Sequence, residues 1–139
     1  MAFEQVGGAD RALEMARDYA LDRMAFGRPI GCFQAIKHKL ADVYVANTLA
    51  RSNAYYAAWA LAAGEGELAE AAANARISAT EAYRLSAAES LQTHGGIGFT
   101  WEHDCHLHYR RANLLAVALG SPRYWENRLI DAMLRRNAA

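Results

Sequence analysis

Residues 91–102 read Leu91-Gln92-Thr93-His94-Gly95-Gly96-Ile97-Gly98-Phe99-Thr100-Trp101-Glu102 and lie between two long stretches of helical pattern. Three glycines cluster here, and glycine allows positive φ and a close approach of another molecule to the backbone. The side chains of Gln92 and His94, an amide and an imidazole, add polar groups next to these glycines. Two interpretations are open: a helix C-terminus followed by a turn, or a surface that receives a ligand or a partner. The spacing alone does not choose between them.

Composition bounds the class of protein. The chain has 139 residues, of which 53% are hydrophobic, enough for one folded domain with a core. Fifteen basic and fifteen acidic side chains give a formal net charge of zero, so we expect no nucleic-acid partner and no anionic membrane partner. A neutral surface also offers little charge repulsion against association. The two cysteines make no disulfide framework and predict a reducing, cytoplasmic location.

The sequence predicts an all-α fold. Proline occurs only at positions 29 and 122, alanine is abundant, and no alternating strand pattern of useful length is present. Long helical stretches with short connections predict an antiparallel, up-and-down four-helix bundle with an additional short C-terminal helix, forming a single domain over residues 1–139. The expected helices cover residues 8–24, 32–63, 67–94, 102–119 and 123–136, with breaks at 64–66 and 120–122.

Helical periodicity suggests which side chains face the core. Leu13, Ala16, Ala20 and Met24 recur at the spacing of one helix face. The same pattern reaches back toward Phe3 with no cap in front, so we expect the chain to begin inside an element.

The second expected helix is long for a domain of this size. It would span about 45–50 Å, against a radius of gyration of about 14 Å for a compact domain. The bundle should therefore be elongated, or this helix should lean on a body outside the chain. Three aromatic residues near its end, Tyr55, Tyr56 and Trp59, are expected to be packing residues.

The connection at residues 23–31 reads Arg-Met-Ala-Phe-Gly-Arg-Pro-Ile-Gly. Gly27 can end the first helix, and Pro29 can fix a turn before the second. Arg23 and Arg28 flank the ring of Phe26. These arginines either face solvent in a plain helix–helix connection, or offer guanidinium groups to a phosphate or pyrophosphate beside a ring for a planar group.

Other polar clusters give weaker signals. His103, Cys105, His106 and His108 are metal-ligand types, but on one helix they do not converge, and no accompanying zinc motif is present. We therefore predict no metal site, and no nucleophile pair from Cys105 and His108. The glycine cluster lacks the preceding strand of a phosphate loop. The carboxylates at positions 102 and 104 are expected at a helix N-terminus, where they favour the macrodipole.

Two long signatures in this sequence resemble the acyl-CoA dehydrogenase family. The first is Arg23-Met24-Ala25-Phe26-Gly27-Arg28-Pro29-Ile30 followed by Phe33-Gln34-Ala35-Ile36-Lys37-His38-Lys39-Leu40-Ala41-Asp42, and the second is Gln92-Thr93-His94-Gly95-Gly96-Ile97-Gly98-Phe99 followed by Glu102 and Arg110. Their order and separation are about those of the family. The resemblance covers nearly the whole chain and maps to the C-terminal helical domain, without the N-terminal helical and middle β domains.

The resemblance implies a flavoprotein of lipid degradation. Members use FAD to remove the α and β hydrogens of an acyl-CoA thioester, and their C-terminal domains form the core of a homo- or hetero-oligomer. Arg23 matches the residue that reaches the FAD pyrophosphate of a neighbouring subunit, and Phe26 matches a ring near the adenosine end. Gln92, Gly95 and Gly96 match the segment that receives the adenine and ribose, and Gln34 matches a position near the cofactor.

The catalytic base of the family has no counterpart here. Many members carry a glutamate before Gly-Thr or Gly-Ser, and that position falls on Leu119, before Gly120-Ser121. Leucine cannot accept a proton. Other members carry the base on the helix that matches residues 8–24, at a position that would precede Met1. Glu102 matches a family glutamate with a structural role and is not a substitute base.

Three interpretations follow. The chain is a fragment or subunit of an acyl-CoA dehydrogenase whose base lies upstream or on a partner, a non-catalytic partner subunit that completes a neighbour's FAD site, or a relative that uses flavin for other chemistry such as oxygenation.

Overall fold

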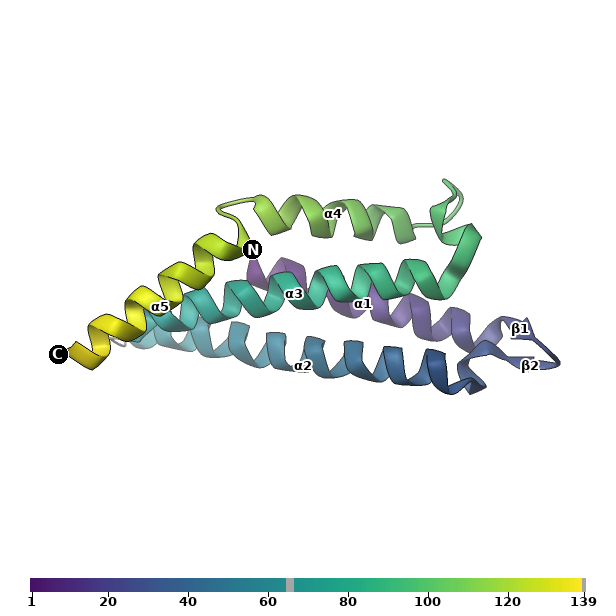
Figure 1. Ribbon diagram of the computed structural model, residues 1–139, viewed down its shortest axis with the longest axis horizontal. Coiled ribbons are helices and arrows are strands. Elements are labelled where there is room, and N and C mark those ends of the chain that lie inside the picture. Colours follow the sequence, from purple (N-terminus) through teal and green to yellow (C-terminus); the bar gives the residue numbers. More distant parts are fainter. Residues whose placement is uncertain (65–66, 139) are drawn as a thin grey trace.

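The computed structural model describes residues 1–64 and 67–138. The predicted all-α class and antiparallel arrangement are confirmed, because the long helices run up and down along one axis (Figure 1). In chain order, the elements are α1 (Ala2–Asp22), β1 (Met24–Ala25), β2 (Arg28–Pro29), η1 (Ile30–Cys32), α2 (Gln34–Ala63), α3 (Leu68–His94), η2 (Gly95–Phe99), α4 (Cys105–Val117) and α5 (Pro122–Ala138).

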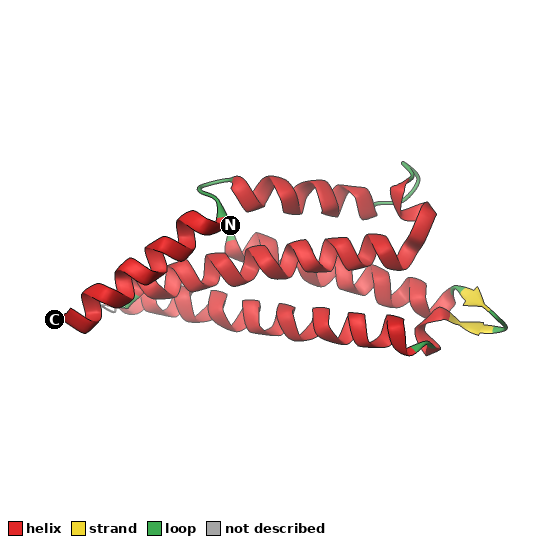
Figure 2. Cartoon of the chain, in the orientation of Figure 1, coloured by secondary structure: helices red, strands yellow, loops and turns green. Residues whose placement is uncertain are grey.

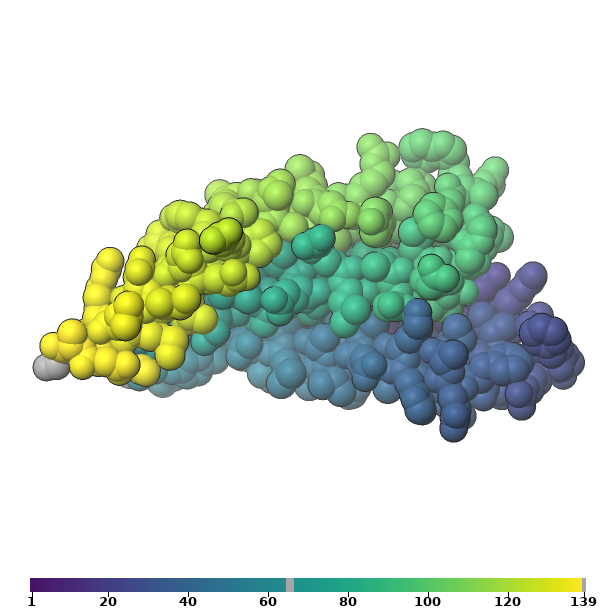
Figure 3. Space-filling model, in the orientation of Figure 1, coloured from purple at the N-terminus to yellow at the C-terminus, as the bar shows by residue number. Residues whose placement is uncertain are grey.

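Helix α3 is the centre of the molecule. It packs against α1, α2, α4 and α5, whereas α1 contacts α2 strongly and α4 more weakly. The result is the expected elongated body, with the β1–β2 hairpin at one end and the C-terminus of α5 at the other (Figures 1 and 3). The additional C-terminal helix is present as predicted, and with 17 residues α5 is longer than the 13-residue α4.

The core is built largely of alanine. Ala9, Ala12, Ala16 and Ala20 are all at most 2% exposed and follow each other at three- and four-residue steps along α1. Such small side chains let helix axes approach closely, and α3 contributes its own alanines to the same layer. The predicted face was correct for Ala16 and Ala20 but wrong for Met24, which is 55% exposed.

Large apolar side chains lie mostly outside this core. The expectation that the aromatics near the end of α2 are packing residues is wrong within this chain: Tyr55 is 63% exposed, Tyr56 44% and Trp59 54%. Phe3 contacts Tyr55 edge-on at 5.2 Å, and Tyr56 stacks on Trp59 at 5.7 Å. The alanine core needs little volume, so the bulky residues of α2 are left on its outer face.

Several helix boundaries differ from the prediction. Helix α1 begins at Ala2 rather than near residue 8 and ends at Asp22, and α4 covers only Cys105–Val117 instead of residues 102–119. Gly64 ends α2 in the left-handed conformation, as a C-terminal glycine should; the rest of the expected break, Glu65 and Gly66, lies outside the described residues. Asp104 is the N-cap residue of α4, but its side chain makes no capping hydrogen bond.

The connection after α1 is a β-hairpin, which the sequence did not predict. Met24 pairs with Pro29 and Ala25 with Arg28, leaving a two-residue loop of Phe26 and Gly27 (Figure 2). Both loop residues have positive φ, 52° and 77°, as a type I′ turn requires. Gly27 thus closes a hairpin and does not end the helix.

Candidate functional site

The hairpin tip presents an exposed aromatic ring between basic side chains. Phe26 is 96% exposed, and its backbone has a φ of 52°, which is unfavourable for a residue with a side chain. Its ring meets Phe33 edge-on at 6.2 Å, and the guanidinium of Arg28 lies 4.3 Å from the centre of the Phe33 ring. Strained residues of this kind concentrate at functional sites.

Arg23 stands at the base of this hairpin. Its backbone is fixed, because its N–H donates to the Tyr19 carbonyl at 2.8 Å and its own carbonyl accepts from Ile30 at 2.8 Å. Its side chain is exposed and has no hydrogen-bond or ion-pair partner within residues 1–64 and 67–138. Gln34, the first residue of α2, is also exposed. Both groups are therefore available to an external ligand.

The glycine segment at the end of α3 combines both interpretations that the sequence left open. Gly95, with φ 63°, caps α3 through its N–H, which donates to the carbonyls of Leu91 and Gln92. Gly96 is exposed, and a side chain added there would meet nothing within 4 Å. The Gln92 side chain is exposed as well. The segment is thus a helix cap whose outer surface is open.

His94 does not join that surface. It is 4% exposed, and its ring stacks on Tyr19 of α1 at 4.4 Å. Because α1 and α3 both end here, this contact places the glycine segment at the same end of the bundle as the hairpin (Figure 1). The six candidate residues therefore share one end of the molecule, on three separate segments: the hairpin, the start of α2 and the end of α3.

Two of the residues that the sequence predicted not to converge, His103 and Cys105, meet His94 at the end of α3. Cys105 Sγ lies 3.3 Å from His94 Nδ1 and 3.3 Å from His103 Nδ1. The expectation of no convergence holds for His106 and His108, which bond elsewhere: His106 Nδ1 is 2.7 Å from the His103 carbonyl, and His108 Nδ1 is 3.1 Å from the Tyr83 hydroxyl. The expectation is wrong for His103 and Cys105. His103 lies before α4 and so is not on the same helix as Cys105, and both residues meet His94, the last residue of α3.

Burial sets the protonation of this cluster. It raises the pKa of the Cys105 thiol, which is 1% exposed, and lowers the pKa of His94, with the Ser90 carbonyl opposing the latter shift. The thiol and the neutral imidazole are the forms that burial favours.

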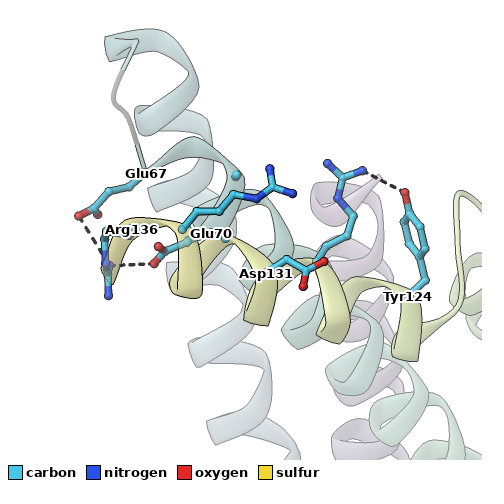
Figure 4. Close-up of a pocket in the computed structure, with 9 residues that line it drawn as sticks. Glu67, Glu70, Tyr124, Asp131 and Arg136 are labelled. Atoms are coloured by element: carbon cyan, nitrogen blue, oxygen red, sulfur yellow. Dashed lines mark hydrogen bonds and ion pairs between the residues drawn. The ribbon is translucent and has the colours of Figure 1, made fainter. Parts of the chain in front are cut away.

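A pocket of 810 Å³ lies at the other end of the molecule, between the start of α3 and α5. Figure 4 shows its polar lining: Arg136 pairs with Glu70 at 2.8 Å and with Glu67 at 3.9 Å, and Arg128 donates to the Tyr124 hydroxyl at 3.0 Å. None of the six candidate residues lines it.

Comparison with known proteins decides the family. The sequence profile of "Acyl-CoA dehydrogenase, C-terminal domain" matches residues 1–134. The chain belongs to the acyl-CoA dehydrogenase family. No helix within the described residues combines the length and apolar character needed to traverse a bilayer.

Named relatives agree with this assignment. Acyl-CoA dehydrogenase IpdE2 from Mycobacterium tuberculosis is 48% identical over 123 residues, 88% of this chain and 37% of that protein. Butyryl-CoA dehydrogenase from Megasphaera elsdenii has a similar structure, with a TM-score of 0.91 and 30% identity over 96% of this chain and 34% of that one. In the ChsE4-ChsE5 complex from Mycobacterium tuberculosis, the similar chain gives a TM-score of 0.88 with 32% identity, over 94% of this chain and 35% of that one. The chain thus spans well under half the length of these acyl-CoA dehydrogenases.

Leu119, which the sequence resemblance placed at the family's glutamate position, lies on the loop between α4 and α5. Leu119 is 72% exposed and has φ 61°, and its carbonyl accepts a hydrogen bond from the Trp125 indole at 3.1 Å. Gly120 follows with φ 111°. The loop presents a side chain to solvent, but that side chain is apolar.

Proposed function

We propose that this chain is the C-terminal part of an FAD-dependent acyl-CoA dehydrogenase assembly, in which it completes the FAD site of a neighbouring subunit. The observation that carries the proposal is the hairpin tip, where Phe26 is held exposed in a left-handed conformation, on a hairpin that Arg23 precedes and to which Arg28 belongs. The left-handed backbone conformation of a residue with a side chain costs about 1–2 kcal/mol of folding free energy. Contact between the exposed ring and a ligand would explain why the protein keeps this conformation.

The candidate residues suit the chemical groups of FAD. The free guanidinium of Arg23 suits the pyrophosphate, and Phe26 offers a flat face near the adenosine end. Gln92 provides an amide for hydrogen bonds, and the open space over Gly96 lets a flat ligand lie against the backbone beside Gly95. Gln34 adds a second amide at the same end of the bundle. Bound FAD would accept the β hydrogen of the acyl thioester as hydride.

The base that removes the α proton lies outside this chain in our proposal. Leu119 has no group that accepts a proton, so the base lies upstream in a longer chain or on a partner. The ChsE4-ChsE5 complex is an assembly of two differently named components, which supports a partner. A non-catalytic subunit that completes a neighbour's site is the alternative, and an oxygenase-like relative is a third reading.

An oligomer of like or unlike subunits fits the surface. Apolar side chains that the alanine core leaves exposed lie on α2, α4 and α5, which gives a partner extensive contact area. They include Tyr44, Leu49, Trp59, Leu61, Leu107, Leu114, Ile130 and Leu134. A cytoplasmic location stays a prediction.

The test is to measure flavin content and acyl-CoA dehydrogenation of this chain, alone and mixed with candidate partner subunits. We expect little flavin alone, and flavin and activity with the right partner. In that assembly Arg23→Ala should lower flavin retention about 10-fold or more, the loss of roughly one charge-assisted contact. Arg17→Ala is the control, since Arg17 is an exposed α1 arginine paired with Asp18. Equal flavin content in the Arg23 and Arg17 variants would exclude the pyrophosphate role.

The position of the base has its own test. Leu119→Gln in the active assembly should leave dehydrogenation within about twofold, because residue 119 takes no part in proton transfer. A loss of activity in an assembly that retains its flavin would place this loop in the active site and contradict our prediction that residue 119 takes no part in the reaction.

A further inference from the structure

Three metal-ligand side chains converge where α3, the following loop and α4 meet. One donor atom from each of His94, His103 and Cys105 lies within 4.8 Å of the other two. The thiol sulfur is central, at 3.3 Å from the Nδ1 atom of each imidazole. Two histidines and one cysteine form a donor set that zinc and related transition ions prefer over calcium or magnesium.

The two sulfur–nitrogen distances are close to those of tetrahedral coordination. Zinc binds sulfur at about 2.3 Å and imidazole nitrogen at about 2.0–2.1 Å, so two such ligands at a tetrahedral angle lie about 3.5 Å apart. The two S–N distances of 3.3 Å are therefore within a few tenths of an ångström of the edges of a zinc site. A small movement of the side chains would admit the ion.

The surroundings hold two of the three ligands firmly. Cys105 is 1% exposed and His94 is 4% exposed, whereas His103 is half-buried and leaves one side of the cluster accessible. Tyr19 packs on the other side, stacked on His94 at 4.4 Å and edge-on to His103 at 6.5 Å. The cluster is therefore mostly buried and held by packing, and His103 is its most exposed member.

We propose that His94, His103 and Cys105 form a binding site for a Zn²⁺-like transition ion, with a fourth position for water. Binding breaks the S–H bond of Cys105, releases that proton to solvent and forms a metal–thiolate bond, with no change in oxidation state. The two imidazoles bind as neutral ligands.

One existing hydrogen bond opposes binding. The N–H at His94 Nδ1 donates to the Ser90 carbonyl oxygen at 2.7 Å, so binding the ion through Nδ1 breaks this hydrogen bond and moves the proton to Nε2, which leaves the imidazole neutral. The carbonyl is not left unpaired, because in α-helical geometry it also accepts the backbone N–H four residues later. The exchange therefore costs one side-chain hydrogen bond and gains a metal–nitrogen bond.

The position of the site gives it a structural consequence. The ion would join the last residue of α3 to the first residue of α4, and the segment Gly95–Phe99 lies in the loop thus closed. A bound ion should therefore reduce the motion of the glycine segment. This inference concerns residues of this chain alone and does not depend on flavin binding.

The test is titration of the 139-residue chain with Zn²⁺, followed by calorimetry and by metal analysis after desalting. We expect one Zn²⁺ per chain. Cys105→Ser should weaken Zn²⁺ binding at least about 100-fold. Loss of a residue that only supports a metal ligand can already cost about that much affinity, and Cys105 is itself a ligand in this proposal. Cys32→Ser is the matched control, because Cys32 is the other free thiol and is exposed. Absence of stoichiometric uptake, or equal loss in the two serine variants, would overturn the proposal.

Two further measurements keep the test independent of the folding of the Cys105 variant. His103→Gln changes a half-buried loop residue and should also abolish tight binding, whereas His38→Gln changes an exposed histidine of α2 and should not. Co²⁺ bound to the unmodified chain should show a thiolate-to-metal charge-transfer band. A Co²⁺ complex without that band would exclude Cys105 as a ligand and overturn the proposal.

Discussion

Arg76, within α3, donates a 2.8 Å hydrogen bond from Nη2 to the carbonyl oxygen of Ala118, the residue that follows α4. The same nitrogen donates to the Leu115 carbonyl, and Nη1 donates to Gln5 of α1 and to Thr80. Arg76 is 5% exposed, and burial lowers its pKa. One guanidinium therefore satisfies the end of α4 and joins three helices just before the loop of residue 119.

Arg76→Ala should lower the free energy of unfolding by about 3 kcal/mol, because it leaves buried carbonyl and amide acceptors without a donor. Urea denaturation of the chain measures this. Arg84→Ala is the control, since Arg84 is an exposed arginine on the same helix, and it should change stability by less than about 0.5 kcal/mol. Equal effects of the two substitutions would show that the buried network does not stabilise the fold.

The helical fold could be predicted because its determinants are local. Long proline-free stretches rich in alanine, with Pro122 and Gly64 at two of the breaks, specify where helices can form. The core assignments failed where they relied on side-chain size. Met24 and Trp59 are large and apolar, but α1, α2 and α3 pack through alanines and leave both exposed. Only the packing of several helices decides which face is inside.

The candidate site was predictable only as far as sequence signatures reach. The amino-acid sequence does not predict a type I′ turn at Phe26, because that turn requires positive φ and phenylalanine disfavours positive φ. The His94, His103 and Cys105 cluster joins residues from two helices and the loop between them, so spacing along one helix could not reveal it. The role of Leu119, by contrast, was predicted from the resemblance to the family and stays a prediction, and the structure adds that it lies on a loop whose carbonyl at Leu119 accepts a hydrogen bond from Trp125.

Gly7 and Gly8 should respond oppositely to alanine. Both lie within α1, where alanine is favoured over glycine by about 1 kcal/mol. A Cβ at position 7 meets nothing within 4 Å, so Gly7→Ala should stabilise the chain by up to that amount. At position 8 a Cβ would lie 2.5 Å from Tyr83, so Gly8→Ala should destabilise by about 1–3 kcal/mol. Thermal unfolding of both variants checks the pair; a stabilised Gly8→Ala would mean that Tyr83 moves freely.

Stability should fall as the pH is lowered through about 6.5. Burial lowers the pKa of His108 and of His94; Arg11 adds to the shift of His108, and Asp104 opposes it. Because the unfolded chain then binds more protons than the folded chain, the free energy of unfolding decreases as pH falls below the unfolded pKa of about 6.5, until the folded pKa is passed.

Denaturation at pH 7 and pH 5.5 measures the size of this loss. His108→Gln should make the loss smaller, since its titration is removed while an amide can still bond to the Tyr83 hydroxyl. His38→Gln, which alters an exposed histidine, should leave the pH dependence unchanged. An unchanged pH dependence in the His108 variant would rule out that residue as a contributor.

Phe26→Asn should separate stability from function. Asparagine tolerates the left-handed conformation better than phenylalanine, and the ring is 96% exposed, so the variant should be more stable by about 0.5–1 kcal/mol. If the ring contacts the neighbour's FAD, the assembled variant should nevertheless retain less flavin. Urea denaturation of the chain and flavin absorbance of the assembly measure the two effects. Tyr109→Asn is a control for flavin retention, because Tyr109 is an exposed aromatic residue of α4, 44% accessible, outside both the hairpin and the glycine segment. A Phe26 variant that gains stability and retains full flavin would mean that the strained ring serves something other than the cofactor.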